Sequence, residues 1–191
     1  MELLEAISHH GIVRDYSPQE VPRTVLHELL RAAAQAPCVT NRQPIVFCVY
    51  QGRKRLRNYS DRIKAHLLAT RAPSFELCGP DEMLADPAYN AFYNASTLLV
   101  ICAKSTTFDP AEDCCLAAEN LMLAAHAHGL GTCPIAFARP WLTLPETKQE
   151  LEIPLDLTPI FSLVIGYPAK PVVEPSPNEQ EPEIAVWKSG D

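Results

Sequence analysis

The sequence lacks the features that membrane, secreted and nucleic-acid-binding proteins need. Its longest largely apolar run, residues 95–103, is far shorter than the roughly 20 residues that span a bilayer. The N-terminus contains Glu2 and Glu5 and has no apolar core typical of a signal peptide. The chain has 16 Lys and Arg against 23 Asp and Glu, whereas nucleic-acid binding needs a basic face. We therefore expect a cytoplasmic protein with no membrane or nucleic-acid partner.

The common catalytic motifs are also missing. HExxH, GxSxG, the phosphate-binding loop and a carboxylate pair are all absent. Gly129 and Gly131 form a weak GxG, but it follows a predicted helix, and Pro134 stands where a dinucleotide fingerprint needs its last glycine. The motifs therefore predict no catalytic side chain.

The 7 cysteines form an odd set without a CxxC pair. Cys48 and Cys102 lie within apolar stretches, where reduced thiols act as small hydrophobic side chains. We predict that the thiols are reduced and that there is no metal site. A zinc or disulfide site is the alternative, although Cys114 and Cys115 are too close to be paired ligands on one helix face.

Length and patterning predict one domain with an extended tail. The 191 residues are 47% hydrophobic, which is enough to fill an ordinary core. We predict helices at 3–7, 19–35, 60–70, 110–129 and 140–151, and strands at 45–50, 97–103, 129–137 and 159–166. The predicted fold is α+β, with a mixed, mainly antiparallel sheet around a buried central helix. The domain should cover residues 1–171 and the tail residues 172–191.

Three segments carry more specific predictions. Asp109, Pro110 and Glu112 are typical of a helix start, and the body of that helix is apolar almost all round, which predicts burial. The basic cluster at 53–57 is predicted to be exposed surface, with phosphate binding as the alternative. The proline-rich tail carries Trp187 and other apolar residues, so it should dock on a partner subunit.

Four segments, in order, resemble the flavin-dependent nitroreductase family. Residues 10–16, HGIVRDY, resemble the family's Arg-Arg-Ser-Val-Arg-x-Phe/Tyr opening, and residues 36–44, APCVTNRQP, resemble Ala-Pro-Ser-x-x-Asn-x-Gln-Pro. Residues 113–135 follow the family's central helix and Gly-Leu-Gly turn. Ile-Pro at 153–154 and Ile-Gly-Tyr-Pro at 165–168 complete the match.

This resemblance implies a homodimer whose subunits embrace each other with their tails and bind FMN at the interface. Hydride would pass from NAD(P)H through the flavin to a nitroaromatic, a quinone or a similar electrophile. Because the flavin carries the chemistry, few acid or base side chains are needed. The cofactor-binding residues implied by the motif match are His10, Gly11, Ile12, Arg14, Pro37, Cys38, Val39, Asn41, Pro134, Ile135, Ala136, Phe137 and Gln180.

The resemblance assigns most of these residues to the isoalloxazine ring and the ribityl chain of the flavin. Contacts to the ring or the ribityl chain would come from residues 37–39 and Asn41. Arg14 would face the pyrimidine edge of the ring. Residues 134–137 would lie along the ring and direct a backbone N–H toward N5. The alternatives are a surface salt bridge for Arg14, a loop cap for Asn41 and a plain core strand for residues 134–137.

The phosphate end departs from the family pattern. His10, Gly11 and Ile12 replace two arginines and a serine, and the basic residues of the family's tail fall near Gln180. Losing two charge-assisted hydrogen bonds would weaken FMN binding by about 3–6 kcal/mol. His10, Arg42 or the basic cluster at 53–57 could replace part of this. Two alternatives therefore stay open: an enzyme that holds flavin loosely or uses it as a substrate, and a binding or regulatory protein without redox chemistry.

Overall fold

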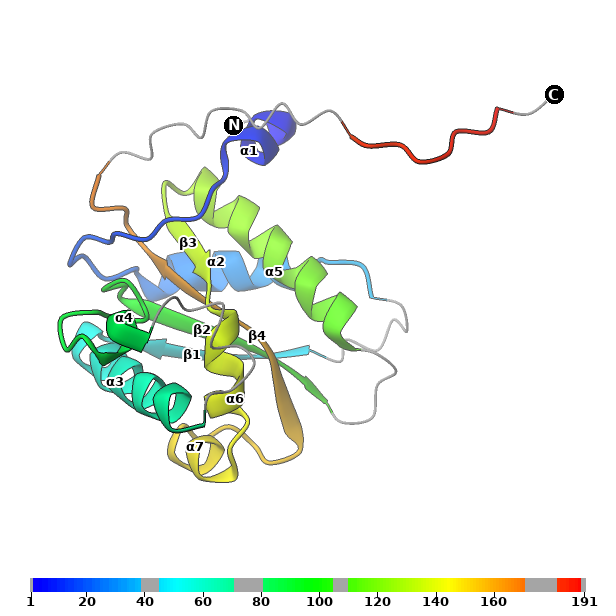
Figure 1. Cartoon of the computed structure of the whole chain (residues 1–191). Coiled ribbons are helices and arrows are strands. Elements are labelled where there is room, and N and C mark those ends of the chain that lie inside the picture. The colour runs from blue at the N-terminus through cyan, green and yellow to red at the C-terminus, as the bar shows by residue number, and fades with distance from the viewer. Residues whose placement is uncertain (1, 39–44, 71–80, 105–109, 171–181, 190–191) are drawn as a thin grey trace.

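The fold is a four-stranded sheet with helices on both faces (Figure 1). The computed structural model describes residues 2–38, 45–70, 81–104, 110–170 and 182–189. The elements in chain order are α1 (Leu3–His9), α2 (Arg23–Ala34), β1 (Ile45–Gln51), α3 (Arg53–Thr70), α4 (Asp81–Ala85), β2 (Thr97–Lys104), α5 (Pro110–Ala127), β3 (Gly131–Pro134), the 3₁₀ helix η2 (Ala136–Ala138), α6 (Arg139–Leu142), α7 (Pro145–Glu150) and β4 (Leu157–Gly166).

The strands lie in the order β1-β2-β4-β3, and each neighbouring pair is antiparallel. The prediction of a mixed sheet was therefore wrong for these four strands. The one parallel pairing among the described residues is an isolated bridge between Ile12 and Thr132. The hydrophobic pattern identified the strands but did not determine which of them pair, and strand direction follows from that pairing.

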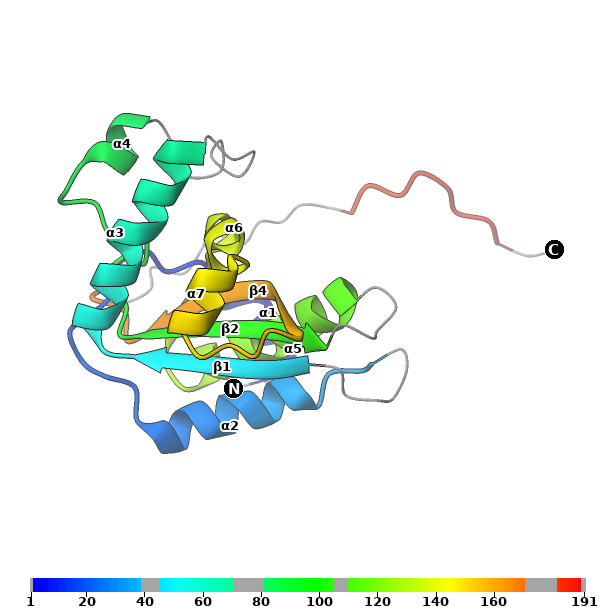
Figure 2. The ribbon, with the colours of Figure 1, turned by 90° about the horizontal axis from the view of Figure 1, so that it is seen from below.

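Alternating side chains of β2 fill two separate cores. Leu98 and Val100 point to the face covered by α3 and α6, and Leu99 and Ile101 point to the face covered by α2 and α5. Figure 2 shows the sheet with α2 on one side and α3, α6 and α7 on the other. Because both faces of β2 are covered, this strand is apolar almost throughout, and for that reason the sequence predicted it well.

The long helix α5 confirms the predicted helix from residue 110, but it is buried on one side only. It packs against α2 and the sheet through residues such as Ala117, Ala118 and Leu121. On the opposite side Cys115 is exposed, and the Leu116 side chain is 44% exposed. The prediction of full burial was therefore wrong for this helix.

Several element boundaries differ from the predictions. α3 begins at Arg53, because Gly52 turns the chain with a φ of 108° and Leu56 already packs in the core. The predicted helix at 140–151 is two helices, α6 and α7, because Pro145 holds Leu144 in an extended conformation with ψ at 135°. α2 starts at Arg23, four residues later than predicted, and α4 was not predicted.

The two ends of the chain expose apolar side chains. α1 lies against α5 through Ala6, while Leu3, Leu4 and Ile7 face outward. Residues 182–189 form no helix or strand and run away from the body (Figure 1). Trp187 in this segment is 79% exposed. No helix in the described ranges has the length and apolar character that crossing a membrane would require.

Candidate functional site

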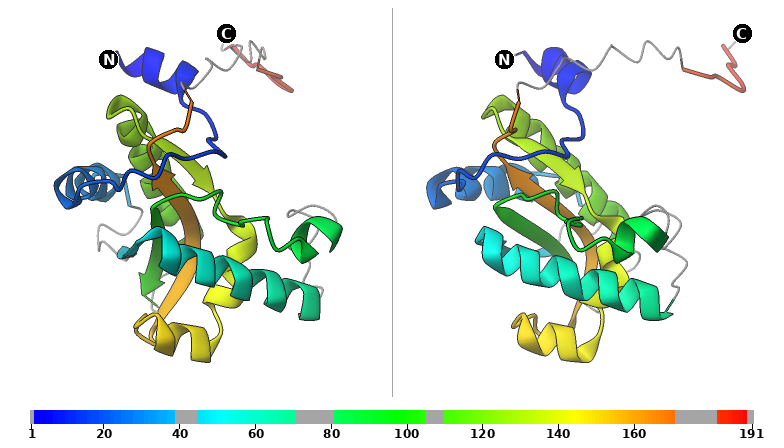
Figure 3. Two further views of the ribbon diagram at one scale, coloured as in Figure 1. Left: turned by 90° about the vertical axis from the view of Figure 1, so that its left-hand side faces the viewer. Right: turned by 60° about the vertical axis from the view of Figure 1, so that its left-hand side comes forward.

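The opening motif lies directly beside β3. The backbone N–H of Val13 donates to the Thr132 carbonyl over 2.9 Å, and the N–H of Ala169 donates to the Asp15 carbonyl over 2.9 Å. Figure 3 shows the dark-blue N-terminal segment running past β3 and the end of β4. Gly131 permits this approach, since a Cβ there would lie 2.5 Å from Cγ2 of Val13. The structure thus brings two of the predicted site segments together.

Arg14 projects from this segment next to β3. Its side chain is exposed, and no ion pair of its guanidinium is recorded among the described residues, so the predicted alternative of a surface salt bridge is not seen there. Burial raises the pKa of the neighbouring Cys133 thiol, and the positive charge of Arg14 opposes that rise. Arg14 is therefore a cation held close to the end of β3.

Residues 134–137 leave β3 and enter η2, and their side chains face different ways. Ile135 and Phe137 are buried in the core, so only their backbone is available to a ligand. Pro134 is half-buried, Ala136 is exposed, and the Ile135 carbonyl accepts hydrogen bonds from the N–H of Ala138 and the Ser162 hydroxyl. The N–H of Ala136 heads η2 and has no recorded acceptor in the described part of the chain. This strip offers an apolar surface and one backbone donor without a recorded acceptor among the described residues.

Pro134 and Ala136 also border a hollow at the edge of the sheet. Its volume is about 160 Å³, and it is lined by Pro134, Ala136, Arg139, Ile160, Phe161 and Ser162. Arg139 was not among the predicted site residues. No motif includes it, and it reaches the site only because η2 and α6 follow directly on β3.

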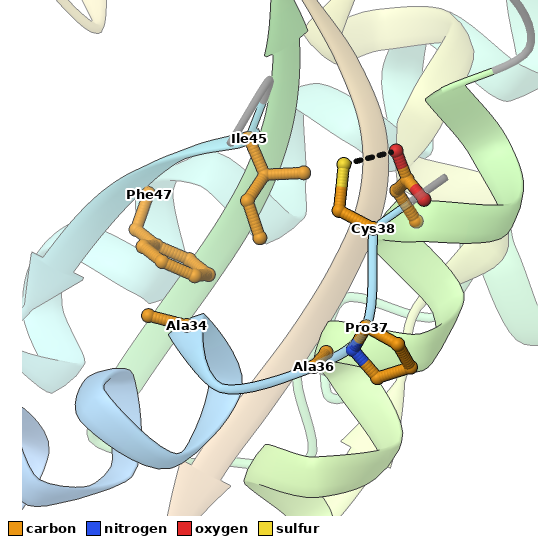
Figure 4. Close-up of a pocket in the computed structure, with 7 residues that line it drawn as sticks. Ala34, Ala36, Pro37, Cys38, Ile45 and Phe47 are labelled. Carbon is orange, nitrogen blue, oxygen red and sulfur yellow. Dashed lines mark hydrogen bonds between the residues drawn. The ribbon is translucent and has the colours of Figure 1, made fainter. Parts of the chain in front are cut away.

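The second motif forms a separate pocket near the opposite edge of the sheet (Figure 4). The Cys38 thiol donates to the Asp113 carboxylate over 3.2 Å, and Pro37 and Phe47 also line a cavity of about 190 Å³. Asp113 is 5% exposed and lies in the first turn of α5, where the helix dipole favours negative charge. Sequence analysis did not single out this contact, because its partners are 75 residues apart. Val39 and Asn41 lie outside the described residues.

The two pockets are separate cavities on either side of β2, since β2 lies between Phe47 in the first and Phe161 in the second. The cavity at Cys38 lies beside Ile45 of β1, at one edge of the sheet, and the strip from Pro134 continues β3, at the other edge. The structure therefore places the opening motif beside β3, which leads into residues 134–137, while Pro37 and Cys38 line a different cavity.

At the predicted phosphate end, His10 already has partners. Its Nδ1 lies 2.9 Å from the Ile7 carbonyl oxygen, and its Nε2 lies 3.1 Å from Oε1 of Glu119. Gly11 offers no side chain, and Ile12 presents an apolar side chain that is 53% exposed. Gln180 and Arg42 lie outside the described residues.

Two further groups show the effect of burial. The hydroxyl of Tyr16 is buried without a recorded partner, and burial raises its pKa. Cys48 and Cys102 lie on neighbouring strands, and a hydrogen bond from the Cys102 thiol lowers the pKa of Cys48 to about 7 although burial opposes this. The six described cysteines form no disulfide with one another, and no group of side chains in the described ranges could hold a metal ion.

Fold and site together define an α+β protein with an arginine beside β3 and an apolar strip at Pro134 and Ala136 where that strand ends. The model of the nitroreductase family matches residues 9–167, so the chain belongs to the nitroreductase family and the sequence resemblance is confirmed.

Individual relatives agree with this assignment. The FMN reductase [NAD(P)H] of Bacillus subtilis is 27% identical over 168 residues, which are 88% of this chain and 66% of that protein, just under two thirds of its length. A nitroreductase with bound FMN from Bacteroides fragilis has a TM-score of 0.81 at 24% identity and 100% coverage of both chains. Another with bound FMN, from Desulfitobacterium hafniense, has a TM-score of 0.75 at 20% identity and covers 96% of this chain and 100% of its own. The structural likeness supports the α+β fold.

Proposed function

We propose that this protein is an FMN-dependent oxidoreductase that passes hydride from NAD(P)H to nitroaromatic, quinone or similar electrophilic acceptors. The observation that carries the proposal is the strip at the end of β3. There Pro134 and the exposed Ala136 present an apolar surface, the N–H of Ala136 has no recorded acceptor among the described residues, and Arg14 places a positive charge beside Cys133. Membership of the nitroreductase family and the names of its relatives support it.

The residues at the ring end fit a flavin. Bound FMN would supply reversible acceptance of hydride, and the protein would supply position and electrostatics. Pro134 would offer the ring an apolar surface, and the N–H of Ala136 would donate to a ring nitrogen. Arg14 would place positive charge near the ring edge on which reduction puts negative charge, and a fixed charge of this kind favours the reduced state.

We further propose that the active unit is a homodimer. Pro37 and Cys38 line a cavity separate from the hollow at Pro134, and in this proposal a second copy brings its own Pro37 and Cys38 to the flavin that Pro134 contacts. The exposed apolar side chains of α1, Leu116 and the tail support such an interface. The tail of residues 172–191 would embrace the partner, with Trp187 as an apolar anchor. The reduced thiols expected from the sequence suit a cytoplasmic location.

The phosphate end favours one alternative. His10 is paired with Glu119, and Ile12 presents a methyl-rich surface where the family motif has a serine hydroxyl. A carboxylate beside the expected phosphate position would repel it. The second candidate is therefore a nitroreductase-fold protein that binds flavin loosely or acts without redox chemistry.

Purification without added flavin, followed by an absorption spectrum, separates these candidates. The oxidoreductase should show the oxidised-flavin bands and lose them when NADH or NADPH is added without oxygen. Protein that has no flavin bands and restores none when incubated with FMN would refute the proposal.

Arg14→Ala gives a sharper test. It should slow flavin reduction in stopped-flow experiments more than it weakens flavin binding, because the charge it balances develops during reduction. Arg31→Ala, another exposed arginine, is the matched control on α2. An unchanged reduction rate in Arg14→Ala would remove this residue from the site.

A further inference from the structure

Arg139 is an exposed cation next to the strip that we assign to the flavin. It begins α6 directly after η2, three residues beyond Ala136, and residues three apart in a 3₁₀ turn lie one above the other. No hydrogen bond or ion pair of its guanidinium is recorded within the part of the chain that the structure describes. By contrast, Arg62 is paired with Glu150, and Arg53 donates to the Asn94 carbonyl.

The hollow beside Arg139 is mainly apolar. Pro134, Ile160 and Phe161 form its walls, and the Ser162 hydroxyl already donates to Ile135. The hollow forms because β3 ends at Pro134, opposite Leu163, while the part of β4 from Leu157 to Leu163 continues beyond it. None of its described lining residues is a carboxylate. The nearby Cys114 thiol is neutral at physiological pH, because burial raises its pKa to about 12. The positive charge of Arg139 is therefore not cancelled within the hollow.

The size of the hollow limits what it can hold. A volume of about 160 Å³ is close to that of the roughly 150 Å³ cavity that binds benzene in an engineered protein core. One aromatic ring therefore fits within the hollow. A planar guanidinium at the rim binds a carboxylate through two parallel hydrogen bonds.

We propose that the hollow holds a monocyclic aromatic acceptor and that Arg139 binds an anionic substituent on its ring, of which a carboxylate is the best match. This inference rests on the proposed function, since it places the acceptor beside the flavin strip at Pro134 and Ala136. It makes Arg139 the residue that selects acidic aromatic acceptors over neutral ones.

Paired ligands test the proposal directly. Titration calorimetry of the purified full-length protein should show tighter binding of 4-nitrobenzoate than of its neutral analogue 4-nitrobenzamide. Arg139→Ala should weaken nitrobenzoate binding about ten- to hundredfold, the value of one lost charge-assisted hydrogen bond, and change nitrobenzamide binding less than about twofold. Added salt should weaken nitrobenzoate binding in the parent protein but not in Arg139→Ala.

Controls separate this site from other roles of the residue. Arg23→Ala, an exposed arginine that lines a different groove, should leave both ligands unaffected. Equal losses for both ligands in Arg139→Ala, or no preference for nitrobenzoate in the parent protein, would overturn the proposal. If Arg139→Ala raised the KM for NADPH and left nitrobenzoate binding unchanged, Arg139 would be assigned to the nucleotide phosphate. That result would also overturn the proposal.

The binding measurement does not depend on turnover. Selective nitrobenzoate binding by protein that never takes up flavin would reject the proposed oxidoreductase but retain the anion site. Normal flavin reduction by a protein that binds nitrobenzoate and nitrobenzamide equally would retain the proposed oxidoreductase and reject the anion site.

Discussion

An arginine at position 10 should strengthen FMN binding only when the Glu119 carboxylate is removed as well. The carboxylate lies 3.1 Å from Nε2 of His10, so an arginine placed there would pair with it and leave a phosphate unserved. We expect His10→Arg alone to change FMN affinity by less than about threefold, in keeping with the small effect of exposed charges. His10→Arg combined with Glu119→Gln should add a charge-assisted hydrogen bond worth about 1.5–3 kcal/mol, which is about a ten- to 150-fold gain.

Fluorescence titration of flavin-free protein measures this directly, with riboflavin as the ligand control. Riboflavin has no phosphate, so its affinity should change less than about twofold in every variant, because its ribityl chain is neutral and forms no ionic hydrogen bond with the altered charges. Glu112→Gln is the matched control, since it removes another exposed carboxylate from α5. An equal gain for riboflavin, or no gain for FMN in the double variant, would refute a phosphate position beside His10.

Three further changes test the fold and its thiols. Gly131→Ala places a Cβ 2.5 Å from Cγ2 of Val13. Urea denaturation should therefore show a loss of about 1–3 kcal/mol in the free energy of unfolding. The double variant Gly131→Ala with Val13→Gly should lose less free energy of unfolding than the two single variants together. Deleting residues 171–191 should prevent a stable dimer, whereas a full-length chain that sediments as a monomer would contradict the proposed assembly. Alkylation of Cys48 should rise with a midpoint near pH 7, because its pKa is lowered from 9.0 to about 7, and Cys102→Ala should raise that midpoint. The stability that this thiolate contributes should be complete above about pH 9 and be lost as the pH falls through 7.

Sequence patterns predicted those elements whose signals are local. β2 is buried on both faces and therefore reads as a continuous apolar run. α5 has its proline at the start, and Gly129 has a positive φ of 71° just after its end, as the sequence predicted. The first turns of α3 were missed because Arg53, Lys54 and Arg57 conceal the spacing of its buried residues.

The candidate site was predictable only in part. The opening motif and residues 134–137 were found through the family resemblance, and the structure places them side by side. The contacts of Cys38 with Asp113 and of His10 with Glu119 were not predicted, because each joins segments far apart in the chain. Arg139 carries no motif and gains its position only from where β3 stops.

The pairing of the two chain ends also sets an order of events during synthesis. Ile12 bridges to Thr132, and Tyr16 bridges to Pro168. Each bridge closes a loop of more than a hundred residues. Closing such a loop loses more chain entropy than closing a short one, and pairing between segments so distant in sequence is slow. An N-terminal segment that leaves the ribosome first must wait for the last strand before it can take its place. The surface beside Arg14 is therefore completed only when the domain is nearly finished, so flavin should be captured by the completed chain and not by a nascent one.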